Sequence, residues 1–171
     1  MLCCARSLPY HFANTKQKLW KNDRNGMELT GKTLGILGLG AIGKELAKKA
    51  AAFGMKVLGY SRHIDESFCK EYGIIPADRE TILRESDVIS LHMPQTPLTK
   101  ESINKDAFAQ MKKGVILINT SRGYLVNRAD LIDAIKAGIV ASYGTDVMQE
   151  EPPEADDPLF SLDEVVITPH M

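Results

Sequence analysis

The chain has 171 residues, with 21 basic and 22 acidic side chains and a formal net charge of −1. Because the charges nearly cancel, neither a basic stripe for nucleic acid nor an acidic disordered tail is indicated. The length suits one domain with a sizeable core. The longest apolar runs, such as residues 115–118, have the length of strands, so we expect no membrane-spanning segment.

The N-terminal sequence and the cysteines exclude several other classes. Residues 1–5 form too short an apolar run for a secretory signal, and Arg6 lies on the wrong side of it. The three cysteines include the adjacent pair Cys3 and Cys4, which fits neither a disulfide framework nor a metal site. We therefore predict reduced thiols, a cytoplasmic protein and no bound metal.

The first 29 residues are predicted to lie outside the main domain. Pro9 would sit best near a helix start, and large apolar residues are scattered among polar ones at Leu2, Leu8, Phe12, Leu19 and Trp20. The segment has few partners in a core of its own, so two interpretations stay open: an arm that packs on something else, and a tail that frays. Residues 21–29 are predicted to be a polar connection with a turn at Asn25-Gly26.

Residues 33–43 carry the strongest local signal. A buried strand, with Leu34, Ile36 and Leu37, leads directly into Gly38-Leu39-Gly40-Ala41-Ile42-Gly43, the G-x-G-x-x-G pattern, and then into a helix. The first glycine allows a tight turn, the second lets backbone N–H groups approach a pyrophosphate, and the third lets the helix lie close to the sheet. Glycines also cluster in purely structural turns, but the strand and the helix on either side favour dinucleotide binding.

Regular alternation of strands and helices predicts the fold class. Residues 41–53 are predicted to be a helix that faces inward through Ile42, Leu46, Ala47, Ala50 and Phe53. Further strands are expected at 56–60, 74–75, 88–91, 115–118, 140–145 and 165–168, and further helices at 65–72, after Asp78, at 105–111 and after Asn127. This pattern predicts an α/β fold, a doubly wound parallel sheet with helices on both faces. Residues 148–161, rich in Pro and acidic residues, are expected to form a surface loop.

Polar residues follow the ends of several predicted strands. In such a sheet, ligands bind in the crevice outside the carboxyl ends of the strands. A single Arg there is usually solvated and a single His usually structural, but their shared position favours function. The residues concerned are Ser61, Arg62, His92, Thr120, Ser121, Arg122, Asp146, Glu151 and His170.

Several motifs, in order, resemble one family over nearly the whole chain. They are residues 28–43 with the glycine motif, Phe53-Gly54-Met55, Lys112-Lys113-Gly114, Asn119-Thr120-Ser121-Arg122-Gly123, residues 146–152 and Thr168-Pro169-His170. The chain resembles the coenzyme-binding domain of the D-isomer-specific 2-hydroxyacid dehydrogenases, which include phosphoglycerate dehydrogenases, glyoxylate/hydroxypyruvate reductases and D-lactate dehydrogenases. The resemblance implies a three-layer Rossmann fold and a reversible NAD(P)-dependent oxidoreductase acting on a small 2-oxo or 2-hydroxy acid.

The resemblance also implies three catalytic residues. The essential Arg of the family falls on Arg122, its Glu on Glu151 before Pro152, and its His on His170. Arg122 would pair with the substrate carboxylate and polarise the reacting carbonyl. His170 would be the general acid and, in reverse, the base, while Glu151 would orient its imidazole and favour its protonated form.

The cofactor-binding set combines the glycine motif with residues at the strand ends. Asp146 matches the family position that hydrogen-bonds the nicotinamide carboxamide. The full predicted set is Gly38, Gly40, Ala41, Ile42, Gly43, Ser61, Arg62, Met93, Pro94, Thr120, Ser121, Arg122, Asp146 and His170.

Two departures from the family pattern give further expectations. The family domain is normally inserted in a substrate-binding domain, so residues 1–29 would be an interdomain or dimer-arm segment, residues 30–171 the Rossmann domain, and the substrate domain would be absent. We expect such a chain to bind cofactor but to turn over poorly. In addition, Ser61 stands where NAD users of the family carry Asp, and Arg62 follows it. This favours NADP, with NAD as the alternative.

Other readings of the same motifs stay open. Relatives of the family act as nucleotide-sensing corepressors and can keep the three catalytic residues, so the motifs do not separate an enzyme from a binding protein. A free-standing dinucleotide sensor has no positive signal. The resemblance further implies a homodimer through the coenzyme domain, with Leu8, Phe12, Leu19 and Trp20 as candidate apolar contacts.

Overall fold

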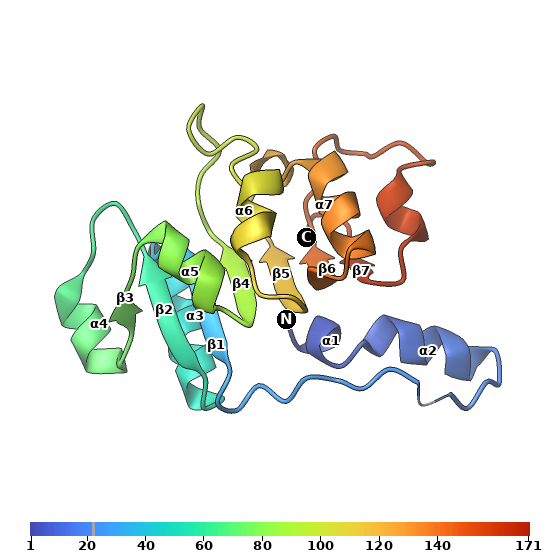
Figure 1. Ribbon diagram of the computed structural model, residues 1–171, viewed down its shortest axis with the longest axis horizontal. Helices are drawn as coiled ribbons and strands as arrows, with labels where there is room; N and C mark the ends of the chain where they lie inside the picture. The colour runs from blue at the N-terminus through green and yellow to red at the C-terminus, as the bar shows by residue number, and fades with distance from the viewer. Residues whose placement is uncertain (22) are drawn as a thin grey trace.

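The computed structural model describes residues 1–21 and 23–171, and their central feature is one parallel sheet (Figure 1). Its strands run in the order β3-β2-β1-β4-β5-β6-β7, and each neighbouring pair is parallel. The strands are β1 (Thr33–Leu37), β2 (Lys56–Tyr60), β3 (Ile75–Pro76), β4 (Val88–Leu91), β5 (Val115–Asn119), β6 (Val140–Thr145) and β7 (Val165–Ile167). The order reverses between β1 and β4, where Leu37 lies between Tyr60 and Leu91. This is where a doubly wound sheet binds its ligand.

Helices cover both faces of the sheet and complete the predicted three-layer α/β architecture. They are α1 (Leu2–Ala5), α2 (Leu8–Lys16), α3 (Ala41–Ala52), α4 (Glu66–Tyr72), α5 (Arg79–Glu85), α6 (Lys105–Gln110) and α7 (Arg128–Lys136), with short 3-10 helices at Gly123–Leu125 and Pro158–Ser161. Two hydrophobic clusters divide at the sheet: α5, α6 and α7 bury side chains in one, and α1, α3 and α4 in the other. Within the described residues, no helix has the length and apolar character needed to cross a membrane.

Capping side chains explain where four of the helices begin. Asp78 and Asn127, both predicted caps, accept hydrogen bonds from the backbone N–H of Thr81 and Asp130. Asp65 and Asn104 do the same for α4 and α6. Each cap satisfies one of the N–H groups that a helix start leaves without a partner.

Helix α3 buries a narrower face than the sequence predicted. Gly43, Ala47 and Ala50 are buried, whereas Ile42 is 72% exposed and Phe53 is also exposed. Small residues let the helix axis approach the sheet, so the inward stripe is one of small side chains. Ile42, directly before Gly43 in the sequence, lies outside this stripe and lines the cleft described below.

The N-terminal segment packs on the sheet more than its sequence indicated. Cys4 and Ala5 of α1 are buried in the same cluster as α3, and the ribbon places α1 beside β6 and β7 (Figure 1). The predicted turn at Asn25-Gly26 is wrong. The chain there runs past α1, and the Met27 N–H donates to the Ala5 carbonyl at 2.6 Å. Asn22, part of the predicted polar connection, lies outside the described residues.

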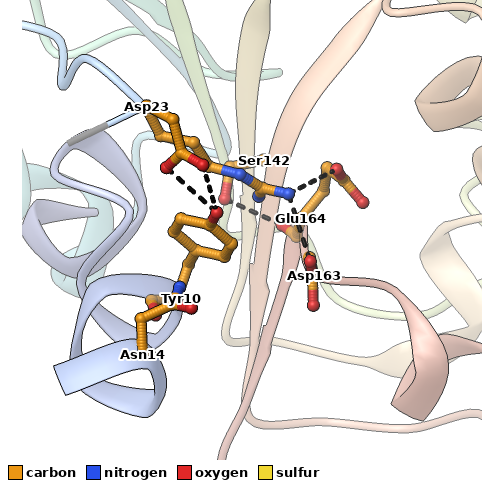
Figure 2. Close-up of polar contacts among 7 residues, drawn as sticks. Tyr10, Asn14, Asp23, Ser142, Asp163 and Glu164 are labelled. Carbon is orange, nitrogen blue, oxygen red and sulfur yellow. Dashed lines mark hydrogen bonds and ion pairs between the residues drawn. The ribbon is translucent and has the colours of Figure 1, made fainter. Parts of the chain in front are cut away.

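Arg24 fixes this connection to the β7 end of the sheet. Its guanidinium lies 4.0 Å from the centre of the Tyr10 ring and pairs with Asp163 at 3.2 Å. Tyr10 in turn donates to the Asp23 carboxylate, and Figure 2 shows these α2 and connection residues meeting the chain just before β7. The segment thus has defined polar contacts, while Leu8, Phe12, Leu19 and Trp20 remain exposed.

The loop 148–161 is only partly at the surface. Asp157 and Leu159 are buried, and residues 158–161 form a 3-10 helix. The Asp157 carboxylate accepts from the Leu159 N–H at 3.0 Å and pairs with Arg128 of α7 at 2.6 Å. The Asp157 carboxylate can be buried because a guanidinium and a backbone N–H both contact it, and these contacts anchor the end of this polar loop.

Candidate functional site

The glycine motif forms a tight junction between β1 and α3. Gly38 has a φ of +111°, and a Cβ there would lie 2.5 Å from the His92 carbonyl oxygen, so only glycine fits. A Cβ on Gly43 would collide with the Gly38 carbonyl oxygen. At Gly40, by contrast, a Cβ would meet nothing within 4 Å. Packing within the protein thus requires glycine at the first and third positions, whereas the second glycine borders open space.

The first turn of α3 presents to that open space N–H groups that lie before the intrahelical hydrogen bonds begin. Gly40 is the N-cap and supplies no side-chain hydrogen bond. Ala41 and Ile42 are exposed, and their N–H groups precede the first intrahelical bond, from Lys44 N–H to the Gly40 carbonyl at 2.9 Å. Amides at a helix N-terminus, with the positive end of the helix dipole, suit a phosphate group. The geometry therefore fits the pyrophosphate of a dinucleotide.

The end of β2 carries a positive charge and no carboxylate. Ser61 is half-buried, and Arg62 is exposed and makes no ion pair with any described residue. The nearest acidic cap, Asp65, is already occupied: it pairs with Lys44 at 2.5 Å and accepts the Phe68 N–H at 3.0 Å.

A cleft of about 300 Å³ lies between α3 and the ends of β4 and β5. Its walls include Ile42, Ser90, His92, Ile118 and Thr120. The Ser90 hydroxyl lies 2.9 Å from Nε2 of His92, and burial lowers the pKa of His92. Such a volume is at the lower end of small-molecule sites, and its mixed apolar and polar walls suit a nicotinamide ring with its ribose. Met93 is buried and Pro94 exposed beside it.

A buried amide shapes the turn that bears Arg122. Asn119, fully buried at the end of β5, donates to the Arg122 carbonyl at 2.9 Å and accepts from the Ser121 N–H at 3.2 Å. The Ser121 hydroxyl donates to the Leu91 carbonyl at 3.1 Å. The turn is thereby tied to β4, and Arg122 projects exposed from it, with Thr120 exposed on the other side.

Asp146 lies at the end of β6 with one carboxylate oxygen buried. Among the described residues, this Oδ1 atom has no hydrogen-bond partner. A buried acceptor without a donor is costly unless a ligand or water supplies one. The preceding Thr145 fixes the turn by donating to the Asn119 carbonyl at 2.9 Å and accepting the Val147 N–H at 3.1 Å. The position predicted to meet a carboxamide therefore has the unmet acceptor that such a donor would satisfy.

Glu151 and His170 form a hydrogen-bonded pair. Oε2 of Glu151 lies 2.8 Å from Nδ1 of His170, and Oε1 accepts the Met148 N–H at 2.9 Å. The bond from His170, followed by the one from Met148, lowers the pKa of Glu151. An ionised carboxylate only accepts hydrogen bonds, so Nδ1 carries the proton and Nε2 is left for another partner.

The structure brings some of the predicted residues together and leaves others apart. Glu151 and His170 are in contact, whereas Arg122 forms no ion pair with either, and its guanidinium donates instead to the Ser121 carbonyl at 2.6 Å. The carboxyl ends of strands precede all three parts of the site: the glycine motif, Asp146 and the Glu151–His170 pair. No cluster of metal-ligating side chains occurs among the described residues.

Several site residues were missed by the sequence reasoning. Asn119 ends an otherwise apolar strand, and that polar ending is a signal that could have identified it. The Met148 N–H and the cleft-lining side chains of Met1, Glu45, Leu46 and Lys49 carry no such signal, because only the fold places them there.

Comparison with known proteins agrees with this geometry. The family described as "D-isomer specific 2-hydroxyacid dehydrogenase, NAD binding domain" matches residues 1–171. The chain is 43% identical to D-3-phosphoglycerate dehydrogenase of Archaeoglobus fulgidus, covering 100% of this chain and 33% of that protein. It is 42% identical to hydroxypyruvate reductase of Thermotoga maritima, covering 100% of this chain and 56% of that protein.

A solved relative shows the same fold. The structure of D-lactate dehydrogenase with NAD⁺ from Lactobacillus jensenii matches with a TM-score of 0.87 and 33% identity, over 99% of this chain and 55% of that one. The chain thus spans between a third and somewhat more than half of these relatives. It belongs to the D-isomer-specific 2-hydroxyacid dehydrogenase family, as that family's NAD-binding domain.

Proposed function

We propose that this chain is the coenzyme domain of an oxidoreductase that interconverts a small 2-oxo acid and the corresponding 2-hydroxy acid. The observation that carries the proposal is the Glu151–His170 pair, 2.8 Å apart, at the same carboxyl edge of the sheet as the glycine motif and the buried Asp146 oxygen, which has no hydrogen-bond partner among the described residues. The relatives named above are dehydrogenases and reductases of such acids. Two classes of acid fit the relatives: phosphoglycerate-like substrates and glyoxylate- or hydroxypyruvate-like substrates.

Three side chains have separate roles in the proposed reaction. The nicotinamide cofactor, when bound, supplies or accepts the hydride at the reacting carbon. His170 gives a proton from Nε2 to the carbonyl oxygen as the new C–H bond forms, and takes it back in the reverse direction. Glu151 holds the imidazole through Nδ1 and balances the positive charge of its protonated form. Arg122, exposed and always charged, binds the carboxylate of the acid.

We infer a preference for NADP over NAD from the end of β2. Ser61 places no carboxylate there to repel a 2′-phosphate, and Arg62 has no competing ion pair among the described residues. Paired dissociation constants for NADPH and NADH, measured by fluorescence titration of the chain, test this. Arg62→Ala should weaken NADPH binding by about 10-fold or more and leave NADH unchanged, because a charged hydrogen bond is worth about 1.5–3 kcal/mol.

A control and a reciprocal variant sharpen that test. Arg84→Ala removes an arginine of α5, whose side chain contacts Thr81, so it should change neither constant. Ser61→Asp should favour NADH. Tighter binding of NADH than NADPH by the unaltered chain would refute the NADP preference while leaving dinucleotide binding established. Failure to bind either cofactor would refute the coenzyme-domain proposal itself.

The corepressor-like alternative is separated from the enzyme by His170. In an intact enzyme that contains this domain, His170→Ala should abolish the reduction of glyoxylate and hydroxypyruvate, while cofactor binding persists. If turnover survives the substitution, His170 is not the general acid.

We also propose that the chain forms a homodimer through its N-terminal segment. Five large apolar side chains there are exposed, and Trp20 is 95% accessible. Each side chain that becomes fully buried contributes about 1.5–3 kcal/mol, so burial of these side chains on both copies would favour association. Trp20 is the only tryptophan, and its emission should therefore shift to the blue on association. A monomer by sedimentation, with red-shifted emission, would exclude the dimer.

A further inference from the structure

Gly123, the residue after Arg122, is in contact with the loop that carries Glu151. A Cβ built on Gly123 would collide with the carbonyl group of Met148 and lie 2.5 Å from the backbone nitrogen of Gln149. The φ of Gly123 is not positive, so its backbone conformation is open to any residue. Glycine is required at this position because the backbone of Met148 and Gln149 occupies the space that a side chain would need.

The backbone that Gly123 admits is the one that holds Glu151. The Met148 N–H donates to Oε1 of Glu151 at 2.9 Å, which leaves Oε2 for His170 at 2.8 Å. A second bond keeps the loop in the same place, from the Gln149 amide to the Val126 carbonyl at 3.0 Å. A displaced Met148 would therefore carry its N–H away from Glu151, and the carboxylate would lose the anchor that directs it at the imidazole.

We infer that Gly123 is a positioning residue for the acid–base pair. It allows the segment that bears Arg122 to lie directly against the backbone of Met148 and Gln149. The position of Arg122, the proposed carboxylate-binding residue, is thereby linked to the orientation of the His170 imidazole. The role of the pair in catalysis rests on the proposed function, whereas the contact and its effect on His170 do not.

The test is the tautomer of His170 in Gly123→Ala, read from the ¹⁵N chemical shifts of the ring at a pH where the imidazole is neutral. The unaltered chain should hold the proton on Nδ1, because the Glu151 carboxylate can only accept it. Gly123→Ala should lower the ratio of Nδ1–H to Nε2–H by at least about threefold, the effect of weakening one hydrogen bond. Glu151→Ala, which removes the acceptor, gives the reference for complete loss.

Gly73→Ala is the matched control. Gly73 has a φ of +67° and nothing within 4 Å of a Cβ, so alanine there strains the end of α4 without touching the site. It should reduce stability and leave the tautomer ratio unchanged. A folded Gly123→Ala chain with the unaltered ratio would overturn the inference.

If Gly123→Ala fails to fold, Gln149→Ala provides the measurement. This variant adds no atoms and removes only the bond to the Val126 carbonyl that holds the same loop. The inference requires a smaller shift of the tautomer ratio in the same direction, and an unchanged ratio overturns it. Because no substrate enters either measurement, a failure here is distinct from a failure of the proposed reaction.

Discussion

Replacing Asp157 with alanine should destabilise the protein by removing the anchor of the 148–161 loop. The Asp157 side chain is 2% exposed, and it serves two partners: Nη1 of Arg128 at 2.6 Å and the Leu159 N–H at 3.0 Å. Alanine leaves that buried N–H without an acceptor, at a cost of about 1–3 kcal/mol.

The lost ion pair adds a smaller contribution. Arg128 is 44% exposed and regains water when its partner is removed, so the pair lies between a surface pair and a buried one, at about 1–2 kcal/mol. Together the two effects predict a loss of about 2–5 kcal/mol in the free energy of unfolding. For a chain of this size, that lowers the melting temperature by roughly 4–20 °C.

Urea unfolding of four proteins measures both contributions: the unaltered chain, Asp157→Ala, Arg128→Ala and the double variant. Asp157→Asn is the matched control, because its amide oxygen still accepts the Leu159 N–H and only the charge is lost. The coupling energy from the cycle should exceed about 1 kcal/mol. A loss below about 0.5 kcal/mol for Asp157→Ala, or a coupling energy near zero, would show that the buried pair does not anchor the loop.

Three further predictions address the glycine junction and two titrating groups. Gly38→Ala should abolish cofactor binding in a fluorescence titration, because its Cβ meets the His92 carbonyl oxygen at 2.5 Å; Gly31→Ala, with nothing within 4 Å, should retain it. The lowered pKa of Glu151 means that its stabilising effect is present above the ordinary glutamate pKa and is lost as the pH falls through the folded-state value, so the stability advantage over Glu151→Gln should vanish in acid; an advantage that grows in acid would contradict this. Since burial lowers the pKa of His92, its imidazole should titrate by NMR below the ordinary value of 6.5, and His92 should favour unfolding as the pH falls below that value; a midpoint at or above 6.5 would show that the cleft does not desolvate the ring.

The features that the sequence predicted well are those encoded within a few consecutive residues. Apolar strand-length runs gave the bounds of β1, β2, β4 and β6 closely, and Asp78 and Asn127 cap the helices that follow them. Capping and the strand–glycine–helix junction depend on contacts between near neighbours in the chain. The local pattern therefore determines them before any tertiary packing forms.

Where the expectations were wrong, the deciding contacts are distant in sequence. The burial of Cys4 and Ala5 depends on β6 and β7, more than a hundred residues away, and the anchoring of Asp157 depends on Arg128. Ile42 fits the apolar periodicity of α3, yet the close approach allowed by Gly43 turns the stripe of small residues inward and leaves Ile42 facing the cleft.

The candidate site divides in the same way. The sequence by itself determined the doubly wound sheet and the strand–glycine–helix junction, and it named Arg122, Glu151 and His170 as candidates, because motifs carry residue types and spacing. Only the tertiary structure decided that Glu151 meets His170 while the Arg122 guanidinium donates to the Ser121 carbonyl, and that the Gly123 backbone makes room for Met148. The physical reason is that a hydrogen bond or a backbone collision is settled within an ångström, and that precision arises only when remote segments pack against one another.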